Sequence, residues 1–301
     1  MVGVFKRSFS VPSKHHSLQS SPPITSHHIR SVSLPCRSHP LISQLKDEIT
    51  DLKTRASKPD NRTSAWLCDA LSSLKVIHNL LDDILQLPQS RESLTHKHDW
   101  VEKLLEDFLR FVDVYGIFQT SVLALKETHY AAQVAIRKKD DSKSALHVEA
   151  TKKMAREMGK LTSTIRCIGK YTVPGSVGVS IGDADQLGGI ISDVIEVTVL
   201  VSLALFNGVS LLFVSRKSSW MGLRLLKLAK RVKVDEGIQE FQQFGVESLW
   251  GLKKKGDEEV WVTLKRMKDL AGCIDSIELV SEKVFRSLIR SRVSLLNALT
   301  Q

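Results

Sequence analysis

The chain has 301 residues, enough for one large domain or two smaller ones, and its 42% hydrophobic composition is ample for a buried core. Its four cysteines contain no Cys-x-x-Cys pair, so we expect neither a zinc site nor a disulfide framework, and a reducing compartment is favoured. The net charge of +10 is concentrated in residues 1–46 and 197–234. Neither stretch has the aromatic residues between cations, or the recognisable module, of a sequence-specific nucleic-acid binder. Sequence-specific binding to nucleic acid is therefore not expected.

The first 38 residues predict a disordered N-terminal tail. They hold ten serines and four prolines but few large apolar residues, and such a segment cannot bury enough surface to offset its ordering entropy. No apolar signal-peptide core is present, which argues against secretion. A cytoplasmic location is expected, while the basic, acid-free composition keeps plastid or mitochondrial import open as an alternative.

The tail repeats the pattern Arg-Ser-x-Ser-x-Pro, which is similar to the first-mode binding motif of 14-3-3 proteins. The residues that define its two copies are Arg7, Ser10 and Pro12, and Arg30, Ser33 and Pro35. In this motif the second serine is phosphorylated, and the phosphate binds an arginine-rich groove. We therefore expect a phosphorylation-controlled docking segment, with coincidence in a Ser/Arg/Pro-rich tail as the alternative.

Helical periodicity begins after the tail. The first predicted helix starts at Pro40, where proline suits the first turn, and ends before Pro59. A second helix begins near Thr63 or Ser64 as its N-cap and continues to Pro88, with apolar residues at spacings of three and four. This spacing predicts a helix that faces a core.

Further helices are predicted from about Leu94 to the polar run at Arg137, from about 143 to 168, and through the last third of the chain. A linker is expected near residues 171–189, where Pro174 stands among several glycines. No alternating strand pattern appears outside this linker. The expected fold is all-α, an elongated multi-helix bundle that follows the tail.

Residues 197–214 form an uncharged stretch whose length is at the lower limit for crossing a bilayer. A helix that is buried on all sides of a bundle has the same composition, and we favour this interpretation because polar residues and a glycine interrupt the stretch. A single membrane span is the alternative.

A basic region at residues 216–234 follows, in which apolar residues alternate with cations. This pattern is typical of an amphipathic helix on an anionic membrane surface, although an ordinary solvated face gives a similar pattern. The candidate membrane-surface residues are Arg216, Lys217, Trp220, Arg224, Lys227, Lys230, Arg231 and Lys233.

No sequence motif predicts catalysis, a cofactor or a metal. His96 and His98 are two residues apart and so point in different directions on a helix, which favours a polar helix start over a metal site. The isolated His78, His129 and His147 lie in helical segments, where packing or solvent exposure is the ordinary role. A non-enzymatic protein is expected, although a site assembled from distant residues stays open.

Three stretches of the chain resemble the plant BYPASS-like family, a domain of unknown function numbered 241. They are the N-terminal signature at Arg30–Leu41, the middle match at Trp100–Gly116, and the C-terminal match at Val284–Asn297. Cys36 stands where the family usually has serine. The resemblance covers about residues 30–301, so it makes residues 39–301 one helical domain with an internal linker.

The resemblance implies a plant protein of root and shoot development with no established catalytic activity and no site residues to transfer. The first hypothesis is a cytoplasmic adaptor that acts through protein–protein contacts under control of its tail. The second is a membrane-associated protein that is held by residues 197–214 and 216–234. A third, an enzyme or transport component for a small signalling molecule, has no supporting motif.

Overall fold

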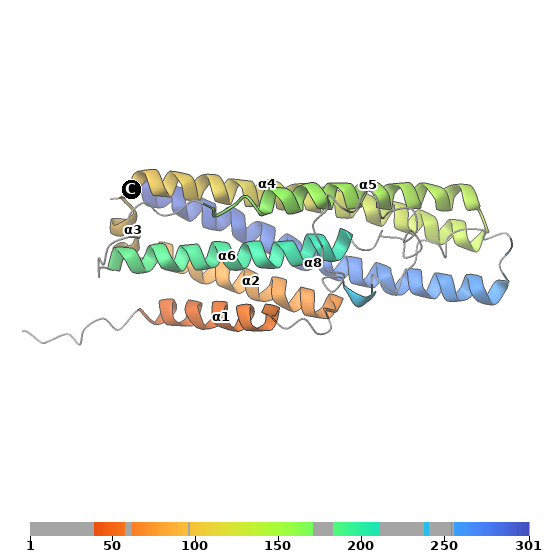
Figure 1. Cartoon of the computed structure of the whole chain (residues 1–301), viewed down its shortest axis with the longest axis horizontal. Helices are drawn as coiled ribbons and strands as arrows, with labels where there is room; N and C mark the ends of the chain where they lie inside the picture. Colours follow the sequence, from red (N-terminus) through yellow and green to blue (C-terminus); the bar gives the residue numbers. More distant parts are fainter. Residues whose placement is uncertain are drawn as a thin grey trace, which may run out of the picture. The chain divides into compact units, whose positions relative to one another are not determined.

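The computed structural model describes residues 39–57, 62–95, 97–170, 183–210, 238–240, 254 and 256–300. Within these ranges the chain is helical apart from turns and short connections, and no strand occurs. The prediction of an all-α fold is confirmed, and Figure 1 shows how the helices lie along one another. The expected tail precedes His39 and lies outside the described residues.

The described helices differ widely in length. In chain order they are α1 Pro40–Ser57, α2 Ser64–Leu85, α3 Pro88–Thr95, α4 His98–Arg137, α5 Asp141–Ile165, α6 Asp183–Ser210 and α8 Asp257–Thr300. The longest are α4 with 40 residues and α8 with 44, and these two helices pack against each other. They therefore extend beyond the shorter helices that pack on them.

Side-chain caps explain where two of the helices begin. The Thr63 side chain accepts a hydrogen bond from the Trp66 backbone N–H at 3.1 Å, so Thr63 is the N-cap of α2. Asp140 plays the same part for α5, because its carboxylate accepts from two backbone N–H groups in the first turn. The N-cap expected at Thr63 or Ser64 is thus Thr63.

The region between α2 and α4 differs from the sequence prediction. Pro88, which was interpreted as the end of a helix, instead opens the short helix α3, as proline readily does at a first helical position. The next helix therefore begins at His98 rather than at about Leu94. A helix of eight residues gives too short a periodic pattern to be recognised from sequence.

The C-terminal part of the linker expected near residues 171–189 is helical, although it contains glycines. Helix α6 already begins at Asp183, so Gly188 and Gly189 are helical, while residues 171–182 lie outside the described residues. A side chain at Gly188 would meet the Trp100 ring at 3.8 Å. Burial of Leu187, Ile190 and Ile191 offsets the weak helix propensity of the two glycines.

Five helices close into a ring. Helix α2 packs on α8, α8 on α4, α4 on α5, α5 on α6, and α6 on α2 again. Helix α1 lies against both α2 and α6, and α3 contacts α6 and α8. By their contacts, residues His39–Gln301 form one compact unit.

Hydrogen bonds between helices establish their relative directions. Ser64 on α2 pairs with Cys273 on α8, and the later residue His78 pairs with the later residue Ser291. Residue numbers increase in the same direction on both helices, so α2 and α8 are parallel. On α4 and α8 the positions run in opposite order, as Gln119 pairs with Ser281 and His129 with Met267. These two helices are therefore antiparallel.

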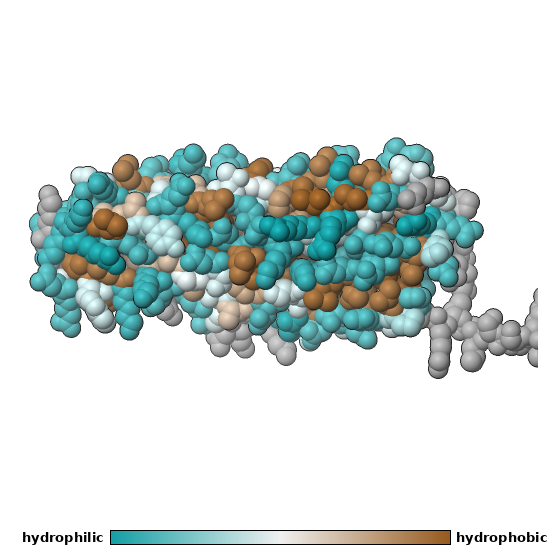
Figure 2. Space-filling model, turned by 180° about the vertical axis from the view of Figure 1, so that it is seen from behind, coloured by the Kyte–Doolittle hydropathy of each residue, from teal (hydrophilic) through white to brown (hydrophobic). Residues whose placement is uncertain are grey.

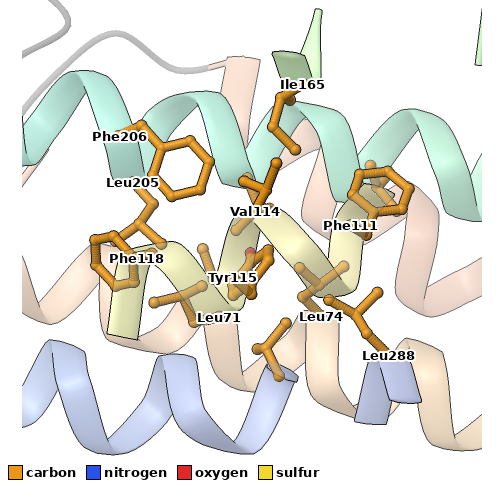
Figure 3. Close-up of a cluster of buried hydrophobic side chains, with 14 of the residues drawn as sticks. Leu71, Leu74, Phe111, Val114, Tyr115, Phe118, Ile165, Leu205, Phe206 and Leu288 are labelled. Atoms are coloured by element: carbon orange, nitrogen blue, oxygen red, sulfur yellow. The ribbon is translucent and has the colours of Figure 1, made fainter. Parts of the chain in front are cut away.

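The centre of the ring is filled by aromatic and aliphatic side chains. Figure 3 shows side chains from α2, α4, α5, α6 and α8 converging there. Tyr115, Phe118 and Phe206 are completely buried, and the rings of Phe118 and Phe206 lie 5.5 Å apart between centroids. Burial of such large side chains contributes much of the stability of the bundle.

The uncharged stretch at residues 197–214 forms the second half of α6 as far as Ser210, and its last four residues lie outside the described ranges. None of the residues from Val197 to Ser210 is exposed. By length and composition, α4 and the Gln186–Ser210 part of α6 could each cross a membrane, but a buried core helix passes the same test. Burial among its neighbours accounts for the apolar composition of α6.

Replacement of a core leucine should show how much buried packing contributes to the free energy of unfolding. We expect Leu74→Ala, at a fully buried position on α2, to lower the free energy of unfolding by about 2–5 kcal/mol, because it removes apolar contacts and leaves a cavity. The control is Val76→Ala on the same helix, where the side chain is 38% exposed and the loss should be below about 1 kcal/mol. Urea unfolding measures both, and equal losses would contradict this description of the core.

Candidate functional site

The residues of the two candidate docking motifs all precede the described part of the chain. Arg7, Ser10, Pro12, Arg30, Ser33 and Pro35 lie before His39. The candidate membrane-surface residues lie between Ser210 and Ile238, also outside the described residues. Both sets of residues therefore stay predictions.

The described residues on either side of the basic region lie at one corner of the bundle. Ile238 is buried, and a side chain at Gly208 near the end of α6 would approach it to 2.7 Å. The next residue, Gln239, donates its backbone N–H to the Arg62 carbonyl at 3.0 Å. Ile238 therefore lies beside the last turn of α6 as described, Asp183–Ser210.

Glu240 also binds this segment, residues 238–240, to the bundle. Its carboxylate accepts hydrogen bonds from the Ser64 backbone N–H at 3.0 and 3.1 Å and from the Ser64 hydroxyl at 2.9 Å. Ser64 begins α2, so the carboxylate satisfies an N–H group that has no partner within the helix, at the end where the helix dipole favours negative charge. This contact joins the chain after the basic region to the start of α2.

A buried polar layer crosses the centre of the bundle. His78 on α2 is 1% exposed, and its two ring nitrogens lie 3.0 Å from the Thr198 hydroxyl on α6 and 3.3 Å from the Ser291 hydroxyl on α8. One turn further along α6, the Ser202 hydroxyl lies 3.1 Å from the Tyr115 hydroxyl on α4. Four helices are therefore connected by side-chain hydrogen bonds in the core.

These groups are held in their neutral forms. Burial lowers the pKa of His78 to about 3, because the charged imidazolium is poorly solvated in the core. Burial also raises the pKa of Tyr115 above its ordinary value, although the hydrogen bond with Ser202 acts in the opposite direction. The layer connects helices and contains no pair that is poised for proton transfer near neutral pH.

A second buried pair of polar side chains lies between α4 and α5. His129 and His147 are 1% and 2% exposed, with ring centroids 5.2 Å apart and an edge-to-face geometry. His129 Nε2 lies 2.8 Å from the Met267 carbonyl oxygen on α8. Burial lowers the pKa of both histidines, to about 3 for His147, where the neighbouring His129 adds to the effect.

The sequence pattern leaves His129 and His147 as isolated histidines and does not predict this pair. A signal was nevertheless available, because His129 is nine residues before Lys138 and His147 is nine residues after it. Lys138 begins the tight turn between α4 and α5, and residues equally distant from such a turn face each other in an antiparallel helix pair. The pairing follows from the turn position.

Asp107 is a buried carboxylate that secures the end of α5. Its Oδ2 atom accepts the Gly169 backbone N–H at 3.2 Å, and Arg110 lies 3.9 Å from its Oδ1 atom. Gly169 has a φ of +70°, and a side chain there would come within 2.7 Å of Ile195, so only glycine fits this turn. Burial raises the pKa of Asp107, while the bond from Gly169 opposes that rise.

Ion pairs attach the outer helices. Lys53 on α1 lies 3.0 Å from Asp193 and 2.7 Å from Glu196, both on α6. Lys126 on α4 pairs with Asp275 at 2.8 Å and also with Glu278, both on α8. The hydrogen bonds to these two carboxylates raise the pKa of Lys126. Such partly exposed pairs contribute modestly to stability and help to specify which surfaces meet.

Large apolar side chains are exposed mainly on α4 and α8. Those that are exposed by 45% or more are Ile117, Leu123, Tyr130, Val134, Leu146, Trp261, Leu279 and Val293. Figure 2 shows hydrophobic patches interspersed with hydrophilic side chains on one face of the molecule. Apolar residues scattered in this way are ordinary on a protein surface and do not by themselves identify a docking site.

Neither the His78 layer nor the His129–His147 pair resembles an assembled catalytic site. Among the described residues no three or more His, Cys, Asp or Glu side chains gather closely enough to enclose a metal ion. Cys68 and Cys273 are half-buried, and burial raises the pKa of both thiols, which disfavours a reactive thiolate. The described part of the chain thus offers structural polar contacts rather than an evident reaction centre.

Comparison with known proteins gave one informative match. A family model described as Protein BPS1 matches residues 70–298, from within α2 to near the end of α8. This range begins later than the residues over which the sequence resemblance was drawn, so the tail and α1 precede it. Searches of curated proteins and of solved structures found no significant match.

Acid should destabilise the bundle through its buried histidines. The unfolded chain protonates them near pH 6.5, whereas folded His78 and His147 stay neutral down to about pH 3. Their stabilising effect is therefore complete above pH 6.5 and is lost as the pH falls from 6.5 towards 3, by up to about 1.4 kcal/mol per pH unit for each histidine.

Urea unfolding between about pH 7.5 and 4.5 measures this dependence. His147→Leu should reduce the slope of unfolding free energy against pH, and the additional change His78→Leu should reduce it further. Carboxylates contribute equally to all three proteins, so the differences isolate the histidines. Identical slopes in the three proteins would contradict the assignment.

Proposed function

The chain belongs to the BPS1 family, and from this premise we propose that it is a non-enzymatic adaptor that acts through protein–protein contacts in plant root and shoot development. Family membership itself indicates a plant developmental protein. The observation that carries the adaptor proposal is the repeated Arg-Ser-x-Ser-x-Pro motif ahead of α1. In this proposal the helical bundle is the platform and the tail is the regulated docking segment, in the cytoplasm.

The chemistry of the motif supports a phosphate-reading partner of the 14-3-3 class. Phosphorylation of Ser10 or Ser33 would add nearly two negative charges and several acceptor oxygens beside an upstream arginine. An arginine cluster binds such a group through charge-assisted hydrogen bonds. The following proline, Pro12 or Pro35, lets the bound peptide turn out of the groove.

The spacing of the two motifs supports a bivalent contact. Ser10 and Ser33 are 23 residues apart, which is enough chain to reach two grooves of one dimeric partner. Binding of the first site raises the effective concentration of the second, so two moderate contacts combine into a tight one. Ser33 is seven residues before Pro40, the first residue of α1, so the partner would lie close to the bundle.

The tail proposal predicts a strong dependence on the number of phosphates. A peptide of residues 1–38 phosphorylated at both Ser10 and Ser33 should bind a 14-3-3 dimer at least about tenfold more tightly than either singly phosphorylated peptide, because the second contact is intramolecular. Isothermal titration calorimetry measures this, with Pro12→Ala and Pro35→Ala as graded controls. If the doubly phosphorylated peptide fails to bind at micromolar concentration, the tail is not such a docking segment.

The second candidate function is attachment to an anionic membrane. The observation that favours it is the basic region at residues 216–234, and Gly208 before it lies next to Ile238 after it. Cations near an anionic surface contribute about 1 kcal/mol each, and apolar residues between them add burial in the headgroup layer. A membrane-associated location belongs to this candidate, and plastid import is a further alternative that rests on the tail.

Sedimentation with vesicles separates the two candidates. If the basic region binds membranes, the full-length protein should sediment with phosphatidylserine vesicles and stay in solution with neutral ones. A variant with Arg224, Lys227, Lys230 and Arg231 changed to Glu should lose this binding. The matched control changes four exposed cations of other segments, Lys103, Lys152, Lys153 and Lys265, to Glu. Equal losses in both variants would show a general charge effect, and no binding by the wild type would favour the adaptor.

A further inference from the structure

Helix α8 carries a continuous seam of residues along its outer face. These residues recur at alternating spacings of four and three, which is the heptad pattern of a helix that packs on another helix. Helix α8 packs on α2 and α4 along its other faces, and none of the seam residues is buried. The seam consists of Asp275, Leu279, Glu282, Arg286, Ile289 and Val293.

Three of the seam residues are large apolar side chains that face solvent. Leu279, Ile289 and Val293 are 55%, 38% and 46% exposed. Each of them would be ordinary alone on a protein surface. At heptad positions of one helix, however, they can interdigitate with apolar side chains of a second helix. The seam therefore fits a helical partner.

The order of the seam residues is self-complementary about Val284. Glu282 and Arg286 lie two residues before and two residues after this position. Leu279 and Ile289 lie five residues before and five residues after it. In an antiparallel pair of identical helices related by a two-fold axis, residues at equal distances on opposite sides of the axis face each other. Such a pair about Val284 would place each glutamate against an arginine and each leucine against an isoleucine.

Charge also selects the direction of the pair. Within one copy, Glu282 already forms an ion pair with Arg286, and neither side chain is buried. Two such ion pairs laid antiparallel form a network of four alternating charges, and a network contributes more than a single exposed pair. A parallel pair would instead bring glutamate to glutamate and arginine to arginine, which repel each other. We propose that the seam on α8 is the contact surface of an antiparallel homodimer whose two-fold axis passes Val284.

The first test is the mass of the full-length protein in solution. Sedimentation velocity over a wide range of concentrations should show a mass that rises from the 33.7 kDa of one chain towards twice that value. A wild-type protein that keeps the mass of one chain at its highest soluble concentration would overturn the proposal. The seam is separate from the tail and from the basic region, so this result does not depend on the proposed function.

Charge reversal tests whether Glu282 faces Arg286 of the second copy. The separate variants Glu282→Arg and Arg286→Glu each place like charges in the central layer, and each should weaken dimerisation at least about tenfold. An equimolar mixture of the two variants should dimerise again, because every arginine then faces a glutamate of the other variant. No recovery in the mixture would rule out the antiparallel pairing about Val284.

Matched controls separate this contact from general effects of charge and helix stability. Asp51→Arg on α1 also reverses the acid of an ion pair with an arginine four residues later, Arg55, and should leave the dimer unchanged. Leu279→Ser should weaken the dimer, whereas Leu146→Ser at an exposed position on α5 should not. Circular dichroism checks that the variants keep the helical fold, and Leu279→Ser provides the test if a charge variant does not. Equal losses in the α8 variants and their controls would contradict the assignment of the surface.

Discussion

The uncharged second half of α6 has to be largely covered, and the arrangement of the other helices covers it so that its residues are buried or partly buried. Helices α5 and α2 flank α6, and α1 and α3 also contact it. Exposure of such a surface to water would cost about 25 cal/mol for each Å² of apolar area. The ring α2–α8–α4–α5–α6 and the position of α1 outside it both follow from covering this one helix. The Lys53 ion pairs then hold α1 against the exposed edge of α6.

Because α6 is covered by other helices, the polar side chains on its buried face need hydrogen-bond partners within the protein. Thr198 and Ser202 hydrogen-bond to backbone carbonyls of their own helix, and their hydroxyls also contact His78 and Tyr115 of α2 and α4. A slip of one turn between these helices would leave several buried polar groups without partners. The polar layer therefore specifies the register that the apolar contacts alone would leave loosely defined.

The part of the bundle beyond the end of α6 is built differently. There α4 and α5 place His129, His147 and Thr151 in buried positions where aliphatic side chains would be usual. The His78 layer is satisfied by hydroxyl groups, whereas this pair is satisfied only on the side of Met267. Other buried polar atoms, such as Asp107 Oδ1 and Gln133 Nε2, also lack a hydrogen-bond partner among the described residues, so the two polar layers differ in their hydrogen bonding alone. The core supports the bundle, and the proposed partner contacts lie in segments outside it.

The sequence by itself determined the helical class and most helix positions, because apolar residues recur at spacings of three and four over long stretches and Thr63 and Pro40 mark helix starts. It also indicated the family, which the match over residues 70–298 confirms. Local pattern did not reveal α3, because eight residues are too few, or the early start of α6, because its glycines are tolerated only through packing. Which histidines meet, and with which partners, was decided by the tertiary structure. Periodicity assigns a face to each helix, but the neighbour of that face depends on how helices distant in sequence pack.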